Sequence, residues 1–229
     1  MTTMDFTETV DFIDFCEPRD EPTTQEIRGF IGGKLVPVDH SRMTPCVLTG
    51  TSEQRAKDLI RIFHYTHSVP SGKSYYVKFG TAIVVWSIPA NKNIATFILG
   101  FPGNVWELSR LWAPNNHAPN LLTRAISAAV GIIRKLENPD ALVSYADPNV
   151  GHSGGVYRAA SWIYHGKSEE TRTYVDKSGQ TFSRRKFHSG GRGMRKAEIE
   201  ALGYKELKLP GKERFVRPLS KRAKRSLTK

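Results

Sequence analysis

Residues 144–166 read SYADPNVGHSGGVYRAASWIYHG, and this stretch decides the fold. It begins inside the run ALVSYA at 141–146, whose short length and apolar, β-branched and aromatic side chains predict a buried strand. Pro148 disfavours helical backbone at the residue before it, so the Asp147 carboxylate is expected just past the strand end. Polar loops that follow buried strands are where α/β proteins commonly carry their chemistry.

A short helix and a further strand complete this unit. Residues 156–162 suit a helix with Tyr157 in its first turn, and residues 162–166 suit a strand. Upstream, the apolar spacing of residues 121–136 predicts a longer helix, with Asn120 as its N-cap. Strand, helix and strand in this order form a β-α-β unit. We therefore expect an α/β (α+β) fold in which helices flank a mixed sheet.

The other expected elements lie in the first half of the chain. They are a hairpin at 30–38, a helix from Glu53 to about Phe63 capped by Ser52, and strands at 75–79, 81–88 and 106–113. The domain organisation that we expect has three parts. Residues 1–25 form an acidic segment whose order the sequence leaves open, residues 26–218 form one domain, and residues 219–229 form a basic tail.

Basic residues are concentrated in the last third of the chain. From Arg158 to Lys229 there are 20 Lys or Arg and 7 Asp or Glu, whereas the first 157 residues hold 14 and 15. This asymmetry is typical of a protein that binds a polyanion, and Phe182 and Phe187 beside the basic clusters favour nucleic acid. The alternative is a solvated basic segment that aids solubility.

Composition argues against several other classes of protein. No apolar run approaches the roughly 20 residues that a membrane-spanning helix needs, so we expect no membrane partner. The acidic start of the chain lacks the basic and apolar segments of a signal peptide. Cys16 and Cys46 give neither a disulfide framework nor a metal cluster, so a reducing cytoplasm is the expected location.

The chain resembles a known family over most of its length. Its order of elements, ending in YRAASW at 157–162, looks like the second half of the GCN5-related N-acetyltransferase (GNAT) fold. More closely, it is similar to the Mom-like DNA modification proteins of bacteriophages from about His64 to Pro218. The motifs that carry this likeness are ELSRLW at 107–112, Pro119-Asn120, SYAD at 144–147, GHSG at 151–154 and YRA at 157–159.

The resemblance implies a substrate and leaves the group donor open. It implies a transferase that converts the N6 amino group of adenine in double-stranded phage DNA to a carbamoylmethyl (acetamido) form, inside the bacterial host, and so protects the DNA from restriction. Many acyl-CoA users of this fold bind pyrophosphate on a glycine-rich loop. The corresponding segment here, residues 110–120, has no glycine and carries Pro114 and Pro119, which lack N–H donors. The cofactor is therefore unknown, and acetyl-CoA and another activated donor, such as an aminoacyl carrier, both stay open.

Asp147 and Tyr157 are the first candidates for catalysis. The amine of adenine is a poor nucleophile because its lone pair is delocalised into the ring, so a transferase needs a base or a hydrogen-bond acceptor on that amine. Asp147 suits this role, and its alternative is a turn residue before Pro148. Tyr157 resembles the residue that protonates the leaving group in this fold, and its alternative is a packed aromatic side chain.

Three further residues are expected to shape the donor or base site. Arg110 lies within a predicted strand and should pair with a phosphate or a carboxylate, for which Glu107 is the structural alternative. His64 and Tyr65 are included because they match the family.

A metal site at the histidines is the weaker interpretation. His64 and His67 are three residues apart and can share one face, but two ligands do not make a site. A third ligand would have to come from Asp147 or His152, so a structural or DNA-contacting role is preferred.

Seven residues are expected to contact the substrate or the DNA. They are Tyr145, His152, Arg158, Arg184, Arg185, Lys186 and Arg192. The function predicted from all of these features is transfer of a small group to DNA adenine. The alternatives are an acetyltransferase that acts on an amine or a protein, and a non-catalytic nucleic-acid-binding protein. The sequence does not fix the oligomeric state.

Overall fold

The chain divides into two compact units. The computed structural model describes residues 43–228 except 116 and 190–191, together with 30–31 and 34–35, so the acidic segment 1–25 lies outside the described residues. The first unit comprises Met1–Ser144, Gly155–Ile163 and Val216–Lys229, and the second comprises Tyr145–Gly154 and Tyr164–Phe215. Within the described part of the chain, no helix has the length and apolar character needed to span a membrane.

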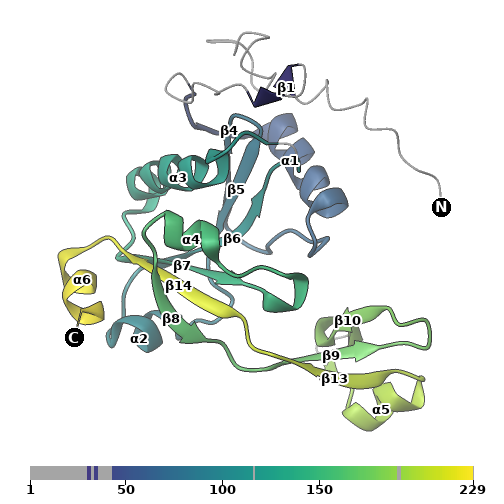
Figure 1. Ribbon diagram of the computed structural model, residues 1–229. Coiled ribbons are helices and arrows are strands. Elements are labelled where there is room, and N and C mark those ends of the chain that lie inside the picture. The colour runs from purple at the N-terminus through teal and green to yellow at the C-terminus, as the bar shows by residue number, and fades with distance from the viewer. Residues whose placement is uncertain (1–29, 32–33, 36–42, 116, 190–191, 229) are drawn as a thin grey trace. The chain divides into compact units, whose positions relative to one another are not determined.

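The first unit is built on a sheet (Figure 1). Its elements are β1 (Phe30–Ile31), β2 (Lys34–Leu35), β3 (Cys46–Val47), α1 (Gly50–Phe63), β4 (Ser74–Phe79), β5 (Ala82–Ser87), α2 (Ile94–Leu99), β6 (Val105–Trp112), α3 (Leu121–Glu137), α4 (Gly155–Ala159) and α6 (Lys221–Leu227). Three strands run from one unit into the other: β7 (Ala141–Ala146), β8 (Ile163–Lys167) and β14 (Glu213–Pro218). The strand order is β3-β4-β5-β6-β7-β14-β8.

The pairing of the strands confirms the predicted fold class. Strands β3 to β6 pair antiparallel, whereas β6 and β7 pair parallel. A parallel pair needs a long crossover connection, and the predicted helix at 121–136 provides it as α3. The result is a mixed α/β sheet in which the carboxyl ends of β6 and β7 lie at the same edge. Ligand sites of α/β proteins are usually found at this edge.

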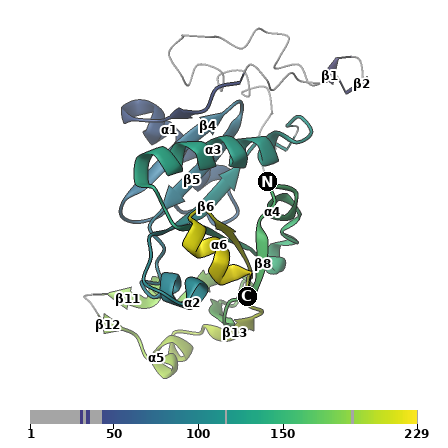
Figure 2. The same cartoon turned by 90° about the vertical axis from the view of Figure 1, so that its left-hand side faces the viewer.

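Helices α1 and α3 cover strands β4 and β5. All six residues of β5 are buried, so both faces of this strand are covered. On one face, Ala56 and Ile60 of α1 pack with Tyr76, Ile83 and Val85. Helix α3 also contacts β4 and β5, and Figure 2 shows it lying across these strands. The β4–β5 turn needs glycine, because Gly80 has a φ of +55° and an added Cβ would lie 2.9 Å from Met43 Sδ.

The predicted helix starts need correction. Helix α1 begins at Gly50 rather than Glu53, and its N-cap is Thr49 rather than Ser52. Ser52 instead lies in the first turn of the helix, where its hydroxyl accepts a hydrogen bond from the Thr49 backbone N–H at 3.2 Å. The serine thus contributes to the capping box as its N3 residue rather than as the N-cap. Asn120 does occupy the N-cap position of α3, but with a left-handed backbone (φ 63°) and no capping bond from its side chain.

The strand predictions are confirmed within a residue or two. The helix predicted at 156–162 is shorter than expected, since α4 ends at Ala159. The chain then turns through Ser161, whose φ of 61° is left-handed. The hairpin predicted at 30–38 is present as the antiparallel pair β1–β2, and the residues around it lie outside the described part of the chain.

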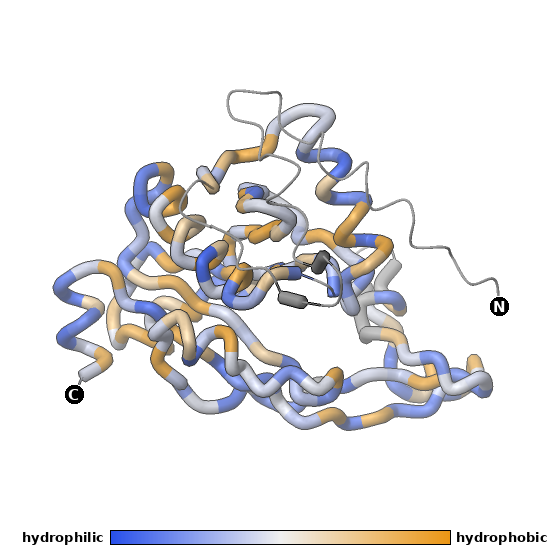
Figure 3. The backbone as a smooth tube through the Cα atoms, turned by 45° about the horizontal axis from the view of Figure 1, so that its top comes forward, coloured by the Kyte–Doolittle hydropathy of each residue, from blue (hydrophilic) through white to orange (hydrophobic). Residues whose placement is uncertain are grey.

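The basic C-terminal residues form an ordered helix. Ser220 caps α6 by accepting a bond from the Ala223 N–H at 3.1 Å. Ala223 is fully buried, and helix α6 packs against α2. Most of α6 is strongly hydrophilic (blue near the C label in Figure 3). Residues 221–227 therefore present their charges from a fixed helix.

The second unit contains a small sheet that the sequence analysis missed. Its elements are η3 (Pro148–Val150), β9 (Thr171–Val175), β10 (Thr181–Ser183), η4 (Arg184–Phe187), β11 (His188–Ser189), β12 (Arg192–Gly193), α5 (Lys196–Ala201) and β13 (Lys205–Leu209). Strand β9 pairs with β10 on one side and β13 on the other. Tyr174, Phe187 and Ile199 form its buried core. The interpretation of Phe187 as an aromatic neighbour for nucleic acid is therefore wrong, because that ring is 6% exposed.

Candidate active site

Tyr157 and Ser144 form a buried polar pair in the first unit. The Ser144 Oγ lies 2.8 Å from the Tyr157 hydroxyl and 2.8 Å from the Leu108 carbonyl oxygen. That carbonyl can only accept, and a serine hydroxyl has one hydrogen. The arrangement that satisfies both contacts has Ser144 donating to Leu108 and Tyr157 donating to Ser144. The pair thus fixes the Tyr157 hydroxyl against the end of the β6–β7 pair.

Burial controls the protonation of Tyr157. Its side chain is 8% exposed and packs against Trp162, with the ring centroids 5.6 Å apart. The pKa of Tyr157 is raised to about 12, chiefly by desolvation; Tyr65 and Glu107 add to the rise, and the bond with Ser144 opposes it. The phenol therefore stays protonated at neutral pH. Tyr65, another predicted site residue of the first unit, thus interacts electrostatically with Tyr157.

His64 and Tyr65 follow directly after α1. His64 is 6% exposed, and its ring lies against the Tyr65 ring in a tilted arrangement with the centroids 4.5 Å apart. The Thr66 backbone N–H donates to His64 Nδ1 at 3.2 Å, so that nitrogen acts as an acceptor. In the neutral ring the proton then lies on Nε2.

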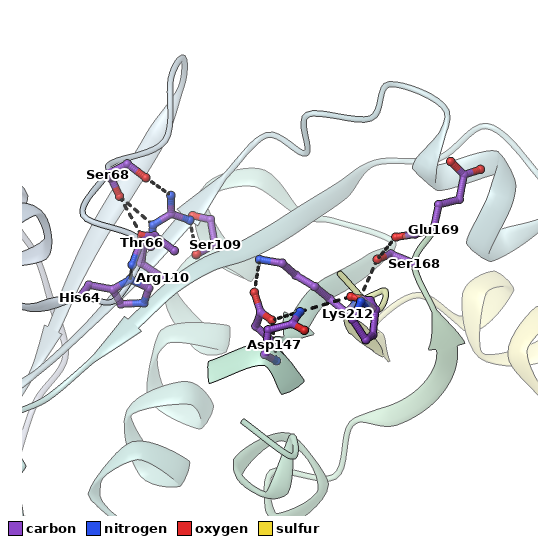
Figure 4. A network of polar contacts seen from close by, with 11 residues as sticks. His64, Thr66, Ser68, Ser109, Arg110, Asp147, Ser168, Glu169 and Lys212 are labelled. Carbon is purple, nitrogen blue, oxygen red and sulfur yellow. Dashed lines mark hydrogen bonds and ion pairs between the residues drawn. The ribbon is translucent and has the colours of Figure 1, made fainter. Parts of the chain in front are cut away.

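Arg110 lies on β6 and holds the loop that follows α1. Its guanidinium donates to the Ser68 carbonyl at 2.8 Å, to the Ser68 Oγ at 3.0 Å and to the Ser109 carbonyl at 2.6 Å. Figure 4 shows Arg110 between Ser68 and Ser109. The arginine thus joins the strand end to the segment that carries His64 and Tyr65.

Asp147 lies in the second unit, where it makes an ion pair and a turn. One carboxylate oxygen lies 2.9 Å from Lys212 Nζ, as Figure 4 shows. The other accepts from the Asn149 backbone N–H at 3.0 Å and from its side-chain amide at 2.9 Å. Burial alone would raise the pKa of Asp147, but the bonds from Lys212 and Asn149 outweigh it and hold the pKa below its ordinary value. The carboxylate is therefore ionised and can only accept hydrogen bonds.

The turn interpretation of Asp147 describes its geometry correctly. The bond to the Asn149 N–H is an Asx turn, and Asp147 is the N-cap of η3. The backbone N–H of His152 donates to the Asp147 carbonyl at 3.1 Å, which folds the polar loop back on the strand end. Tyr145, also in the second unit, is half-buried on β7. The catalytic role of Asp147 stays a prediction.

The five basic residues among the predicted DNA contacts lie on three different elements. Arg158 is exposed on α4. Arg184 and Arg185 lie in η4, and Arg192 lies in β12. Lys186 is exposed, and its Nζ lies 3.3 Å from the centre of the Phe182 ring.

A metal site at the histidines finds no support in the described residues. Among them, no group of three or more His, Cys, Asp or Glu side chains is placed to hold a metal ion. His67 Nδ1 lies 3.0 Å from the Arg61 carbonyl, and His64 Nδ1 lies 2.9 Å from Thr66 Oγ1.

Sequence reasoning missed Ser144 and Lys212. The sequence did carry a signal for Ser144, because a serine within a run of buried strand positions must find a hydrogen-bond partner. The sequence carried no signal for Lys212, since it is far from Asp147 in the chain and meets it only in the tertiary structure.

The mixed sheet flanked by helices defines the chain as an α/β protein. Residues 46–229 match the model of the Mom protein family, and the chain belongs to this family. It is 25% identical over 185 residues to the methylcarbamoylase mom of Escherichia phage Mu, and the match covers 75% of each chain.

Solved structures similar to this chain include two acetyltransferases. The first is a Bacillus subtilis acetyltransferase in complex with CoA, with a TM-score of 0.41, 10% identity, and coverage of 78% of this chain and 100% of the other. The second is the spermidine/spermine N-acetyltransferase SpeG from Vibrio cholerae, with a TM-score of 0.43, 12% identity, and coverage of 82% and 98%.

Proposed function

We propose that this protein is a DNA-modifying transferase that converts the N6 amino group of adenine to a carbamoylmethyl form and so protects phage DNA from host restriction. The observation that carries the proposal is membership of the Mom family, whose matched region, residues 46–229, includes every predicted catalytic residue. The relative from phage Mu is named as a methylcarbamoylase, which supports the choice of product.

Asp147 is proposed to anchor the adenine amine. Its depressed pKa makes it a weak base, but an ionised carboxylate is a strong hydrogen-bond acceptor. An acceptor on the amine draws electron density toward the nitrogen and holds it against the electrophile. We therefore assign Asp147 to orientation of the amine rather than to removal of its proton in the ground state.

Tyr157 is proposed to protonate the leaving group. Its pKa of about 12 keeps the phenol protonated, as an acid catalyst requires. The proton is held by Ser144 before reaction, so the phenol must rotate away from Ser144 to donate it. Tyr65 interacts electrostatically with this phenol, and Arg110 and His64 are proposed to shape the donor or base site with it.

DNA is proposed to bind through the basic residues of both units. In the first unit, Lys221, Arg222, Lys224 and Arg225 are exposed on α6, and none of them forms an ion pair with a carboxylate of the described residues. Cations without a carboxylate partner on a fixed helix suit phosphate contacts, although the Arg222 guanidinium also lies 3.8 Å from the centre of the Phe101 ring. In the second unit, Arg184, Arg185, Lys186 and Arg192 stay the predicted contacts. The target base must leave the stack to reach a pocket, so the proposal includes base extrusion or action on an opened strand.

A restriction assay tests this function in cells. Plasmid DNA from bacteria that express the wild-type chain should resist cleavage at sites that contain adenine, whereas plasmid from cells with Asp147→Asn should be cut normally. Asp176→Asn is the matched control, because Asp176 also accepts bonds within an exposed turn of the second unit. Equal cleavage of all three plasmids, with the proteins well expressed, would contradict the proposal.

A further inference from the structure

Two large apolar side chains are exposed where α1 ends. Ile62 is 58% exposed and Phe63 is 52% exposed. Single exposed apolar residues are ordinary on protein surfaces. Phe63 differs from them because it stacks on Trp112 at the end of β6, with the ring centroids 6.0 Å apart and the planes at 28°.

The ring pair lies beside polar groups at the carboxyl end of β6. Trp112 is two residues beyond Arg110, so both side chains lie on the same face of the strand. Arg110 is bonded to Ser68 in the loop that begins one residue after Phe63. Two separate contacts, Phe63 with Trp112 and Arg110 with Ser68, therefore tie the end of α1 to this strand end.

Trp112 differs from the other tryptophans of the chain. Trp86, Trp106 and Trp162 are buried, at 0%, 3% and 4% exposed, whereas Trp112 is half-buried. A half-buried tryptophan stacked on a half-exposed phenylalanine leaves aromatic surface exposed, on the strand face that also carries Arg110. Planar, electron-rich bases stack on such faces in proteins that bind single strands or extruded nucleotides.

We propose that Phe63 and Trp112 form a stacking surface for a nucleobase of the bound DNA. The inference rests on the proposed function, because it makes DNA the occupant. The base would continue the stack on the exposed side of Phe63, with Trp112 behind, and Arg110 would lie at its edge. No covalent step is involved. The surface would stabilise a base outside the duplex, which base extrusion requires.

The test uses two labelled oligonucleotides. One is single-stranded oligodeoxyadenylate of about twelve nucleotides, a length that suits one such protein. The other has the same length and charge but carries abasic sites. Fluorescence anisotropy measures the affinity of the full chain for each.

Phe63→Leu is the decisive variant, because leucine keeps the apolar surface and loses the aromatic face. We expect it to weaken binding of the oligodeoxyadenylate about tenfold and to leave binding of the abasic strand unchanged. Ile62→Ala, at a neighbouring and equally exposed position, is the matched control and should change neither affinity. Thermal melting should show all three proteins to be folded.

Two results would overturn the inference. Unchanged affinity of Phe63→Leu for the oligodeoxyadenylate would show that no base stacks on this ring. An equal loss for both strands would show that the ring acts without contacting a base, through the sugar–phosphate backbone or through the local fold. The proposed function fails separately, if the wild-type chain makes no modified adenine whatever its affinity for these strands.

Discussion

Each unit has an aromatic cluster beside basic residues, and the two clusters serve different purposes. In the second unit, Tyr174 and Phe187 are 1% and 6% exposed and form the core of a small sheet. In the first unit, Phe63 is 52% exposed and stacks on Trp112 at a strand end. The same combination of basic and aromatic residues thus marks a core in one place and a surface in the other. Burial, which the sequence pattern does not reveal, decides between them.

The candidate site residues of the two units differ in charge state. The first unit holds a buried neutral pair, Tyr157 with Ser144. The second unit holds an ionised, partly exposed pair, Asp147 with Lys212. A neutral phenol can give up a proton, and an ionised carboxylate can accept a hydrogen bond. Tyr157 and Asp147 therefore differ in the chemistry open to each of them.

The largest expected effect is on the free energy of unfolding, when one ring of each aromatic cluster is removed. Phe187→Ala removes a core ring and should lower the free energy of unfolding by about 3 kcal/mol. Phe63→Ala removes an exposed ring and should lower it by less than about 0.5 kcal/mol. Urea denaturation followed by circular dichroism measures both. Equal losses would contradict the assignment of Phe187 to a core and of Phe63 to a surface.

The second effect concerns the buried neutral pair. Ser144→Ala leaves the Tyr157 hydroxyl and the Leu108 carbonyl without the partner seen here, so we expect a loss of about 2 kcal/mol in the free energy of unfolding. Ser127→Ala on α3 is the control, because that exposed hydroxyl donates only to the Thr123 carbonyl one turn earlier. Ser127→Ala should leave the free energy of unfolding almost unchanged. A stable Ser144→Ala variant would mean that Tyr157 finds another partner.

The third effect is on DNA affinity and its salt dependence. Lys221→Ala with Lys224→Ala removes two cations of α6 that have no ion-pair partner among the described residues. We expect the slope of log affinity against log salt to fall by about 2 and the affinity to fall about tenfold. Lys57→Ala with Arg61→Ala removes two cations that are paired with Glu53 and Asp58. That control should change the slope less. Equal changes would rule out a particular role for α6.

The smallest effect concerns the ionised pair and its pH dependence. The pKa of Asp147 is lowered in the folded state, so the pair stabilises the fold above the unfolded value near 3.8 and loses this contribution as pH falls through the folded value. Lys212→Met should therefore cost about 1 kcal/mol at pH 7, since the pair is partly exposed. The difference from wild type should vanish in strong acid. A difference that does not depend on pH would show that packing, rather than charge, holds Lys212.

The elements of this fold that could be predicted are those that a local sequence pattern marks. Periodic apolar spacing predicted α3 and strands β4 to β7, because each of these elements buries a face that its own sequence marks. The small sheet of the second unit was missed because β13 is mostly polar and exposed, so it carries no such mark. The candidate site residues were likewise predictable only where a local pattern or motif marks them. Asp147 and Tyr157 were found from the strand end and the family motif, whereas Lys212 reaches Asp147 only through tertiary structure.

Mass spectrometry of nucleosides tests the central claim most directly. Total DNA from bacteria that express the wild-type chain is digested to nucleosides and weighed, in parallel with DNA from cells that express Asp147→Asn. We predict a deoxyadenosine species heavier by one carbamoylmethyl group, present with wild type and absent with Asp147→Asn. A heavier species carrying an acetyl group would replace the proposed reaction with acetyl transfer. An unmodified nucleoside profile from well-expressed, folded wild-type protein would contradict DNA modification by this chain.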